Sequence, residues 1–254
     1  MAAEPARTVS VVRTMGTVFS LDVRGAGDPR TRAALDAAGA WLEHVDEVFS
    51  TYRPQSQISR LAAGTLALSA CSPEVWEVMR LCDAAERRTR GYFSARYAGG
   101  PGFDPTGLVK GWAVERAAAM IAASGAEAVC VNGGGDIQTH GGPWRIGLAH
   151  PLLPDALAGV VLAPPGGSLA VATSGPAERG AHILDPHTGR PPCGAAASLT
   201  VVTASLSDAD VCATAGYAMG PAARGWLESL PGTQAHGVTA SGEVWATPGF
   251  PSPA

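Results

Sequence analysis

The spacing of apolar residues predicts helices in the first half of the chain. Apolar positions recur at helical intervals over 33–49, after Asp28 and Pro29, a pair that is typical of a helix start. The same spacing predicts helices between 72 and 91 and over 106–124. Helix formation is therefore expected to dominate the chain up to about its midpoint.

Short apolar runs bounded by Gly, Pro or Ser predict strands in the second half of the chain. We expect an opening strand or hairpin over 9–23, a polar loop over 50–60, and strands at 128–131, 144–149, 159–162, 169–173 and 199–204. A last helix is expected over 207–219 with Ser207 as its cap, followed by a hairpin around Ser241-Gly242. Because helices come early and strands cluster later, this order predicts an α+β fold rather than a doubly wound parallel sheet.

Chain length limits the number of domains. A chain of 254 residues can bury a full core, and its length allows either one domain or two small lobes. No linker is long enough to separate independent domains. We therefore expect one compact domain over 9–247, with mixed sheets and flanking helices, and loose termini at 1–8 and 248–254.

Charge and composition exclude several classes of partner. The net charge is −4 with no basic run, which argues against a nucleic-acid or membrane-surface partner. No apolar stretch reaches the roughly 18 residues that a membrane span needs. The first residues show no charged segment followed by an apolar core and no lipobox cysteine, so a cytoplasmic location is expected. The five cysteines form no CxxC pair, which predicts reduced core thiols rather than a zinc site or disulfides.

Lys110 is the single lysine among eighteen basic residues. In a chain that uses arginine almost everywhere, a retained lysine indicates a position where a guanidinium does not fit. A compact ammonium among glycines, close to Asp104, can pair with phosphate oxygens as a point charge. The alternative is an ordinary lysine in the first turn of a helix, and this segment alone does not decide between the two.

Asp210 and Thr214 lie four residues apart in the last predicted helix, so they share one face. A carboxylate beside a hydroxyl offers two hard oxygen ligands for magnesium, provided that phosphates and backbone carbonyls complete the shell. The alternative is simpler. An aspartate in a first helical turn favours the helix dipole, and the threonine can bond the carbonyl four residues back.

Two further segments combine polar residues with turn signals. The segment 132–136 is rich in glycine and lets backbone approach a ligand, but it lacks the Gly-Lys-Ser/Thr of a phosphate loop, so a structural turn is the default. Its Asp136 could orient a ligand or a group that contacts one. In the segment 182–189, His182 could act as a general base near neutral pH, although a lone histidine is more often structural, and Asp185 begins an ordinary proline turn.

Taken in order, these segments resemble the FAD:protein FMN transferases, the ApbE-type flavin transferases. The matching pieces are Met15-Gly16-Thr17, Tyr52 with Ser56, 104–115 with Lys110, 132–136, Ala172-Thr173-Ser174-Gly175, 182–189, and Ala209-Asp210 with Thr214 and Gly220. The resemblance covers nearly the whole chain from about residue 11 to 220. Six or more motifs in the family's order make an accidental match improbable.

The resemblance implies a fold, an activity and a set of site residues. In that family FAD is split at its pyrophosphate with magnesium, and FMN is esterified to a threonine or serine of an acceptor flavoprotein with release of AMP. It implies an ApbE-like α+β fold, as one domain or as two lobes with the flavin site between them. The implied contacts to FAD are Met15, Tyr52, Phe93, Ser94, Ala95, Asp104, Lys110 and Ile183; the magnesium ligands are the Gly107 carbonyl, Asp210 and Thr214; and the catalytic residues are His182 and Lys110, with Asp185 as the second candidate base.

The chain also departs from the family pattern. Leu61-Ala62-Ala63-Gly64 stands where the family often has an asparagine, and the stretch between Phe93 and Asp104 is shorter than usual. Many members are exported lipoproteins, so without a signal the acceptor is expected to be reachable from the cytoplasm. Two other functions stay open: a magnesium-dependent FAD pyrophosphatase that gives FMN and AMP, and a non-catalytic FAD-binding module.

Overall fold

The centre of the molecule is one large antiparallel sheet. The computed structural model describes residues 6–25, 28–96, 102–177, 180 and 183–252. The eight strands lie in the order β1 (Arg7–Thr14), β2 (Thr17–Arg24), β3 (Ala128–Gly133), β4 (Asp136–Gly141), β7 (Ser168–Ser174), β8 (Ser198–Thr203), β9 (Gln234–Val238) and β10 (Val244–Ala246). A separate antiparallel hairpin is made of β5 (Trp144–Ala149) and β6 (Leu157–Ala163).

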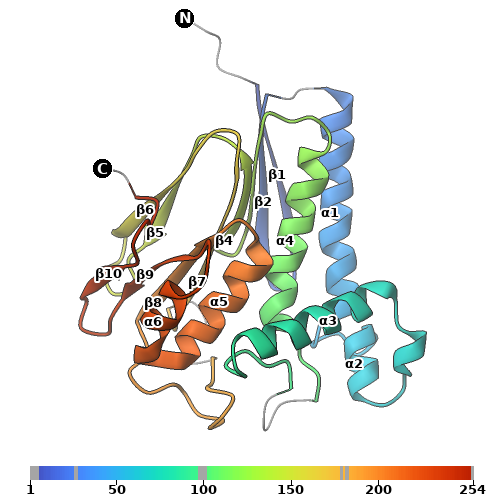
Figure 1. Ribbon diagram of the computed structural model, residues 1–254. Coiled ribbons are helices and arrows are strands. Elements are labelled where there is room, and N and C mark those ends of the chain that lie inside the picture. The colour runs from blue at the N-terminus through green and yellow to red at the C-terminus, as the bar shows by residue number, and fades with distance from the viewer. Residues whose placement is uncertain (1–5, 26–27, 97–101, 178–179, 181–182, 253–254) are drawn as a thin grey trace, which may run out of the picture.

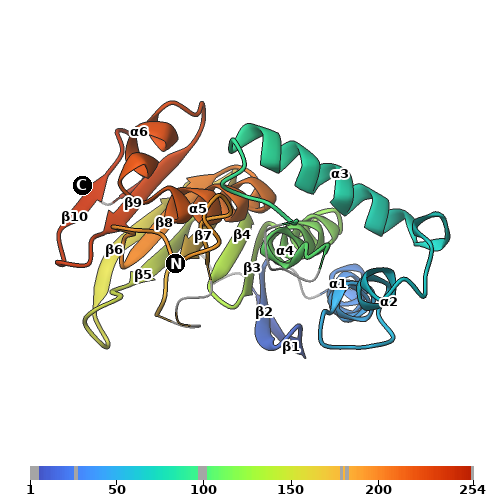
Figure 2. The ribbon, with the colours of Figure 1, turned by 90° about the horizontal axis from the view of Figure 1, so that it is seen from below.

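Helices and the small hairpin lie on opposite faces of this sheet (Figures 1 and 2). The helices are α1 (Pro29–Phe49), α2 (Gln57–Ala62), α3 (Pro73–Arg88), α4 (Thr106–Ala122), α5 (Leu206–Met219) and α6 (Ala223–Glu228), with short 3-10 turns at Leu68–Ala70 and Gly220–Ala222. The helix α4 packs on β3 and β4, and α5 packs beside it on β7 and β8. The helix α3 runs across the outer side of α4, where Trp112 Nε1 donates to Glu77 Oε1 over 3.0 Å. The result is a three-layer arrangement of helices, sheet and hairpin.

Each face of the sheet has its own apolar core. Between the helices and the sheet, Phe19, Leu42 and Ile121 are fully buried within one continuous cluster. On the other face, Ile146 and Val161 of the hairpin pack against the sheet. Burying a large apolar side chain contributes roughly 1.5–3 kcal/mol, so both layers hold the central strands in place.

The predicted α+β class is confirmed, and most predicted elements occur close to the expected positions. The opening segment is a hairpin, and α1 begins at Pro29 with Asp28 Oδ1 accepting from the Thr31 amide over 2.8 Å. Two assignments were wrong. Part of the expected loop over 50–60 is α2, which begins after Ser56, whose hydroxyl oxygen accepts from the Ser59 amide.

The other wrong assignment concerns the start of α5. Its cap is Ser205 rather than Ser207, because Ser205 Oγ accepts from the Asp208 amide. The helix therefore begins a residue earlier than the predicted cap. The strand β4 was not expected from the sequence, since buried Gln138 interrupts its apolar pattern.

The described parts of the two termini are held by pairing. Arg7 and Thr8 belong to β1 and pair with β2. Near the other end, the carbonyl of Pro251 accepts from the Leu162 amide over 2.8 Å, and the Phe250 ring lies 5.4 Å from that of His236. Those residues of 1–8 and 248–254 that the structure describes therefore differ from the loose termini expected. None of the helices in the described part of the chain is long and apolar enough to cross a membrane.

All five cysteines are free, but they do not share one environment. Cys82 is buried, and its burial raises the pKa of the thiol to about 12. Cys71 and Cys130 are partly exposed and Cys193 is exposed. The expected core position therefore holds for Cys82 and Cys212, while the reduced state of the thiols stays a prediction.

Candidate active site

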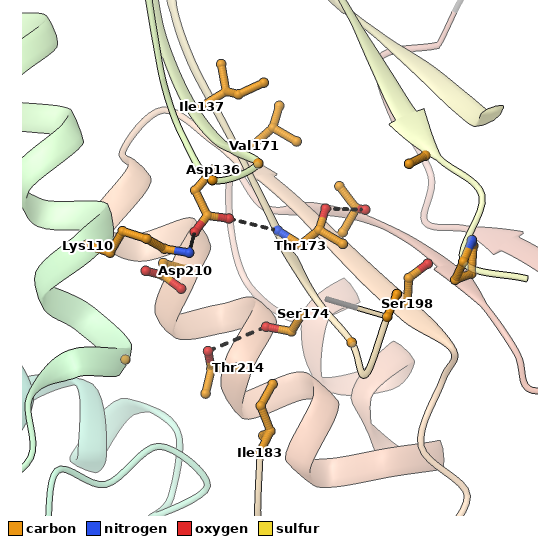
Figure 3. Close-up of a pocket in the computed structure, with 18 of the residues that line it drawn as sticks. Lys110, Asp136, Ile137, Val171, Thr173, Ser174, Ile183, Ser198, Asp210 and Thr214 are labelled. Atoms are coloured by element: carbon orange, nitrogen blue, oxygen red, sulfur yellow. Dashed lines mark hydrogen bonds and ion pairs between the residues drawn. The ribbon is translucent and has the colours of Figure 1, made fainter. Parts of the chain in front are cut away.

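An open cavity of about 840 Å³ lies where the ends of β4 and β7 meet the first turns of α4 and the middle of α5. Figure 3 shows the polar side chains that gather there from these four elements. They are Lys110 of α4, Asp136 of β4, Thr173 and Ser174 of β7, and Asp210 and Thr214 of α5. Segments that are up to about a hundred residues apart in the sequence thus contribute to one site.

Lys110 points into this cavity and is held there by a carboxylate. Its Nζ lies 2.6 Å from Asp136 Oδ2, and the Asp136 side chain is only 4% exposed. The other carboxylate oxygen of Asp136 accepts from the Thr173 amide over 3.3 Å. Asp136 is thereby fixed by the neighbouring strand and fixes the ammonium in turn. The interpretation of Asp136 as a residue that orients a ligand-contacting group agrees with this arrangement.

The position of Asp136 follows from the glycines before it. Gly134 and Gly135 form a two-residue turn between β3 and β4 with φ of 60° and 93°, a conformation that glycine adopts without strain. Asn132 Oδ1 accepts from the Gly135 amide over 2.9 Å and closes the turn. The glycine-rich segment is therefore a structural turn, as expected by default, and it delivers Asp136 to the cavity.

Asp210 and Thr214 point into the same space from consecutive turns of α5 (Figure 3). Asp210 is 8% exposed, and its Oδ2 accepts from the Gly111 amide of α4 over 3.2 Å. Thr214 Oγ1 lies 3.5 Å from Ser174 Oγ. Since residues four apart lie on one side of a helix, Gly107, which lines the cavity, is on the side of α4 that faces Asp210.

This donor set fits a magnesium ion. A carboxylate, a hydroxyl and a backbone carbonyl are hard oxygen ligands, and magnesium commonly takes one or two carboxylates and completes its shell with water and substrate phosphates. Within the described residues no three His, Cys, Asp or Glu side chains come together as a metal cluster. Cys212 lies on the same helix but is buried and is not among the residues that line the cavity. The residues therefore suit an ion bound jointly with a phosphate ligand.

The close approach of α4 and α5 depends on Gly111. A Cβ at this position would lie 2.9 Å from both Asp210 Cβ and the carbonyl oxygen of Leu206. Any side chain here would push apart the helices that carry Lys110 and Asp210. No local pattern in the sequence marks this contact, because the glycine lies inside an apolar helix.

We expect Gly111→Ala to lower the free energy of unfolding by about 1–3 kcal/mol, the usual cost of overpacking a core. Gly225→Ala is the matched control, because Gly225 is also helical but a Cβ there meets nothing within 4 Å. The control is expected to gain up to about 1 kcal/mol from helix propensity. Urea unfolding of both variants measures the difference. Equal stability of the two would show that the helices adjust freely.

Glu115 of α4 holds the start of α5 through hydrogen bonds. It was not proposed as a site residue from the sequence. Its Oε2 accepts from Ser205 Oγ over 2.9 Å, and from the amide and hydroxyl of Ser207 over 2.9 and 2.6 Å. Ser207 is thus a partner of Glu115 instead of the helix cap. A further tie is made by buried Gln138, whose Oε1 accepts from the Leu206 amide over 2.9 Å.

The expected flavin contacts separate into two groups. Tyr52, Phe93, Ser94, Asp104 and Ile183 line the cavity, as do Lys110 and Gly107. Tyr52 stands at its edge with 95% of its surface exposed. Asp104 also holds the start of α4, since its Oδ1 accepts from the amide and the hydroxyl of Thr106.

Met15 and Ala95 are not among the residues that line the cavity. Met15 occupies the turn between β1 and β2 with φ of 48° and packs against the core. Ala95 is 3% exposed, and its carbonyl accepts from the Asp104 amide over 2.8 Å. Both residues were expected as flavin contacts from the family resemblance, and these two assignments stay predictions.

The two candidate bases also differ in their placement. His182 lies outside the described residues. Asp185 does not line the cavity, and its carboxylate accepts from the His187 amide over 2.9 Å and from Thr188 Oγ1 over 3.1 Å. Asp185 therefore stabilises its own turn in this structure, and its assignment as the second candidate base stays a prediction.

Several cavity residues were not predicted from the sequence. His150 and Pro151 come from the turn after β5, and Ser198 comes from β8. Their positions depend on the pairing of distant strands, so no local pattern marked them. Together with the predicted residues they complete a site that offers an ammonium, buried carboxylates, hydroxyls and glycine backbone, which suits a phosphate-bearing ligand and a hard cation.

Comparison with known proteins gives the family of this chain. The sequence pattern of the ApbE family matches residues 15–100 and 94–236, so the chain belongs to the ApbE family. A curated relative, the FAD:protein FMN transferase of Vibrio cholerae, is 34% identical over 130 residues, which are 46% of this chain and 38% of that protein. The matched segment thus spans less than two fifths of the length of that relative.

Solved structures of the family have the same fold over nearly the whole chain. The flavin transferase ApbE from Vibrio cholerae matches with a TM-score of 0.79 at 24% identity, covering 97% of this chain and 98% of that one. An ApbE protein from Thermotoga maritima matches with a TM-score of 0.83 at 20% identity, covering 96% and 97%. The apo form of the flavinyl transferase ApbE from Pseudomonas stutzeri matches with a TM-score of 0.80 at 22% identity, covering 98% and 96%.

Proposed function

We propose that this chain is a magnesium-dependent FAD:protein FMN transferase, with its transferase domain over 9–247. It would cleave FAD at the pyrophosphate, attach FMN through a phosphoester to a threonine or serine of an acceptor flavoprotein, and release AMP. The observation that carries the proposal is the convergence of Lys110, Asp210 and Thr214 in one cavity. Membership of the ApbE family and the name of the relative from Vibrio cholerae support it.

The size and lining of the cavity suit a dinucleotide. Its volume of about 840 Å³ lies in the upper part of the roughly 300–1,000 Å³ range of ligand pockets. Phe93 and Ile183 add apolar side chains to the wall of the cavity, and Asp104 and Ser94 add polar ones. We propose that these residues and Tyr52 hold FAD so that its pyrophosphate lies beside Lys110.

The reaction joins the acceptor hydroxyl oxygen to the phosphorus of the FMN half and breaks the bond from that phosphorus to the oxygen of the AMP phosphate. The AMP phosphate leaves with the electron pair of that bond, so negative charge grows on it. Lys110, held by Asp136, would offset this charge electrostatically. Magnesium held by Asp210, Thr214 and the Gly107 carbonyl would neutralise phosphate charge in the same place. Phosphoryl transfer needs chiefly positioning and electrostatic stabilisation from the protein, and these groups are of the types that supply both.

The proton of the acceptor hydroxyl needs a base, and we propose His182 for that role. The assignment rests on the family resemblance, and removing the imidazole is expected to abolish most acceptor-dependent transfer while leaving FAD affinity largely intact. A loss of about 10²–10⁴-fold is typical for a general base. FAD affinity by fluorescence and transfer by gel, in one preparation of His182→Ala, measure the two effects.

The matched control for this prediction is His187→Ala. His187 lies five residues further along the same segment, is exposed, and contacts the Tyr92 ring edge to face with centroids 4.6 Å apart. We expect this variant to keep transfer near the wild-type rate. Wild-type transfer by His182→Ala would reject the assignment of the base.

A direct test of the function uses FAD, magnesium and a flavoprotein that carries an Asp-x-x-Ser/Thr-Gly-Ala-Thr segment. Flavin fluorescence that stays on the acceptor band after denaturing electrophoresis supports the transferase. A matching acceptor with its Ser/Thr replaced by alanine is the control. Release of FMN and AMP at the same rate with and without acceptor would favour the pyrophosphatase instead.

A further inference from the structure

The turn that joins β5 to β6 and the residue after it carry three exposed leucines. Three leucines are among the large apolar side chains that are exposed in the described part of the chain. All three fall within the six-residue span 152–157. Leu152 is 46% exposed, Leu153 is 56% exposed and Leu157 is 62% exposed. We call these three residues the leucine tip. A cluster of exposed leucines is typical of an interaction surface, whereas single exposed apolar residues are ordinary.

The turn that carries the leucine tip is held by several internal hydrogen bonds. His150 Nδ1 accepts from the amides of both Leu152 and Leu153 over 3.2 Å each. The His150 amide donates to the Ala156 carbonyl over 2.9 Å, and the Ala156 amide donates to the Leu153 carbonyl over 3.3 Å. A turn held by its own hydrogen bonds loses little conformational freedom when a partner covers it, which favours binding.

The leucine tip continues the wall of the candidate active site. His150 and Pro151 line the cavity, and Leu152 follows them directly in the sequence. Leu157 pairs with Ala149 and lies against Gly147, where a Cβ would be 3.1 Å from Leu157 Cδ2. Both Ala149 and Gly147 line the cavity as well. The exposed leucines therefore directly adjoin residues that line the cavity.

We propose that the leucine tip is the docking surface for the acceptor flavoprotein, which would present apolar side chains beside its Thr/Ser. This inference rests on the proposed function, because only a transferase needs a protein substrate whose hydroxyl reaches this cavity. Contact through three partly exposed leucines suits a transient complex, in which the product leaves after one transfer. None of the three leucines lines the cavity, so FAD held as proposed above would not need to touch the leucine tip.

The test is the double variant Leu152→Ser/Leu153→Ser, with KM for the acceptor protein and KM for FAD measured separately. Both positions are exposed, so the fold is expected to persist. We expect KM for the acceptor to rise about tenfold, which corresponds to about 1.4 kcal/mol, while KM for FAD stays unchanged. The probe is the flavoprotein with the Asp-x-x-Ser/Thr-Gly-Ala-Thr segment.

The matched control is Val9→Ser/Val11→Ser. These valines are exposed to a similar degree, 50% and 57%, on β1 at the edge of the large sheet, and they do not line the cavity. A rise in KM for the acceptor in the leucine variant alone supports the docking surface. Normal transfer with unchanged acceptor KM in the leucine variant would reject the docking surface and leave the transferase standing. Absence of transfer by the unaltered chain would reject both.

Discussion

Lys110→Ala is expected to lower the turnover of FMN transfer by about 30-fold to 1,000-fold, which is a loss of about 2–4 kcal/mol of transition-state stabilisation. The reason is that the ammonium stands at the cavity wall, 2.6 Å from a carboxylate that positions it. Without it, charge that grows on the leaving AMP phosphate loses a fixed positive partner. Steady-state rates at saturating FAD, magnesium and acceptor measure the effect.

The ion pair between Lys110 and Asp136 means that Lys110→Ala can lower both turnover and stability. A second variant separates the two effects. Removing Lys110 leaves Asp136 buried with a charge that has lost a partner, which is destabilising in its own right. In Lys110→Ala/Asp136→Asn the buried carboxylate is replaced by a neutral amide, which does not need the lysine ammonium as a counter-charge. The free energy of unfolding is therefore expected to recover, while the turnover of FMN transfer stays low. Recovery of turnover along with stability would mean that the lysine serves only the fold. Lys110→Arg is expected to restore little, because the larger, planar guanidinium does not replace a compact ammonium.

Asp210→Asn is expected to raise the magnesium concentration for half-maximal activity by about tenfold or more, equivalent to about 1.4 kcal/mol of binding. The substitution removes the charge that attracts the cation. It keeps an oxygen that can accept from the Gly111 amide, so the contact between α4 and α5 is preserved. Titration of magnesium at fixed FAD and acceptor gives the shift.

Asp208→Asn is the matched control for this experiment. Asp208 lies two residues earlier in the first turn of α5, but its side chain is 51% exposed and pairs with Arg88 over 2.7 Å. If Asp210 acts only as a charge near the helix N-terminus, the two variants will change melting temperature alike and leave the magnesium response unchanged. A shift in magnesium response for Asp210→Asn alone supports the metal site.

Structure could be predicted from the sequence where a few neighbouring residues determine the local backbone conformation. The start of α1 could be predicted because Asp28 and Pro29 satisfy the requirements of a helix start within four residues. The turn before Asp136 could be predicted because glycine alone adopts its backbone angles easily. The pairing of Asp210 with Thr214 needed only the helical repeat.

Features that depend on tertiary packing could not be predicted. The strand β4 has a polar pattern because Gln138 points into the structure and donates to Ser168 Oγ over 2.8 Å. The roles of Gly111 and Glu115 arise only where α4 meets α5, almost a hundred residues further along the chain. Motif order therefore assigned Lys110, Asp210 and Thr214 to one site, but it could not separate residues that face the cavity from residues such as Ala95 that stand behind it.

The proposed transferase activity is tested most directly by measuring AMP release and acceptor-bound FMN in the same reaction, with intact-mass spectrometry of the acceptor. The transferase predicts equal amounts of AMP and covalent FMN, with both dependent on magnesium and on the acceptor hydroxyl. AMP release without covalent FMN, or tight binding of FAD with no AMP formed, would contradict it.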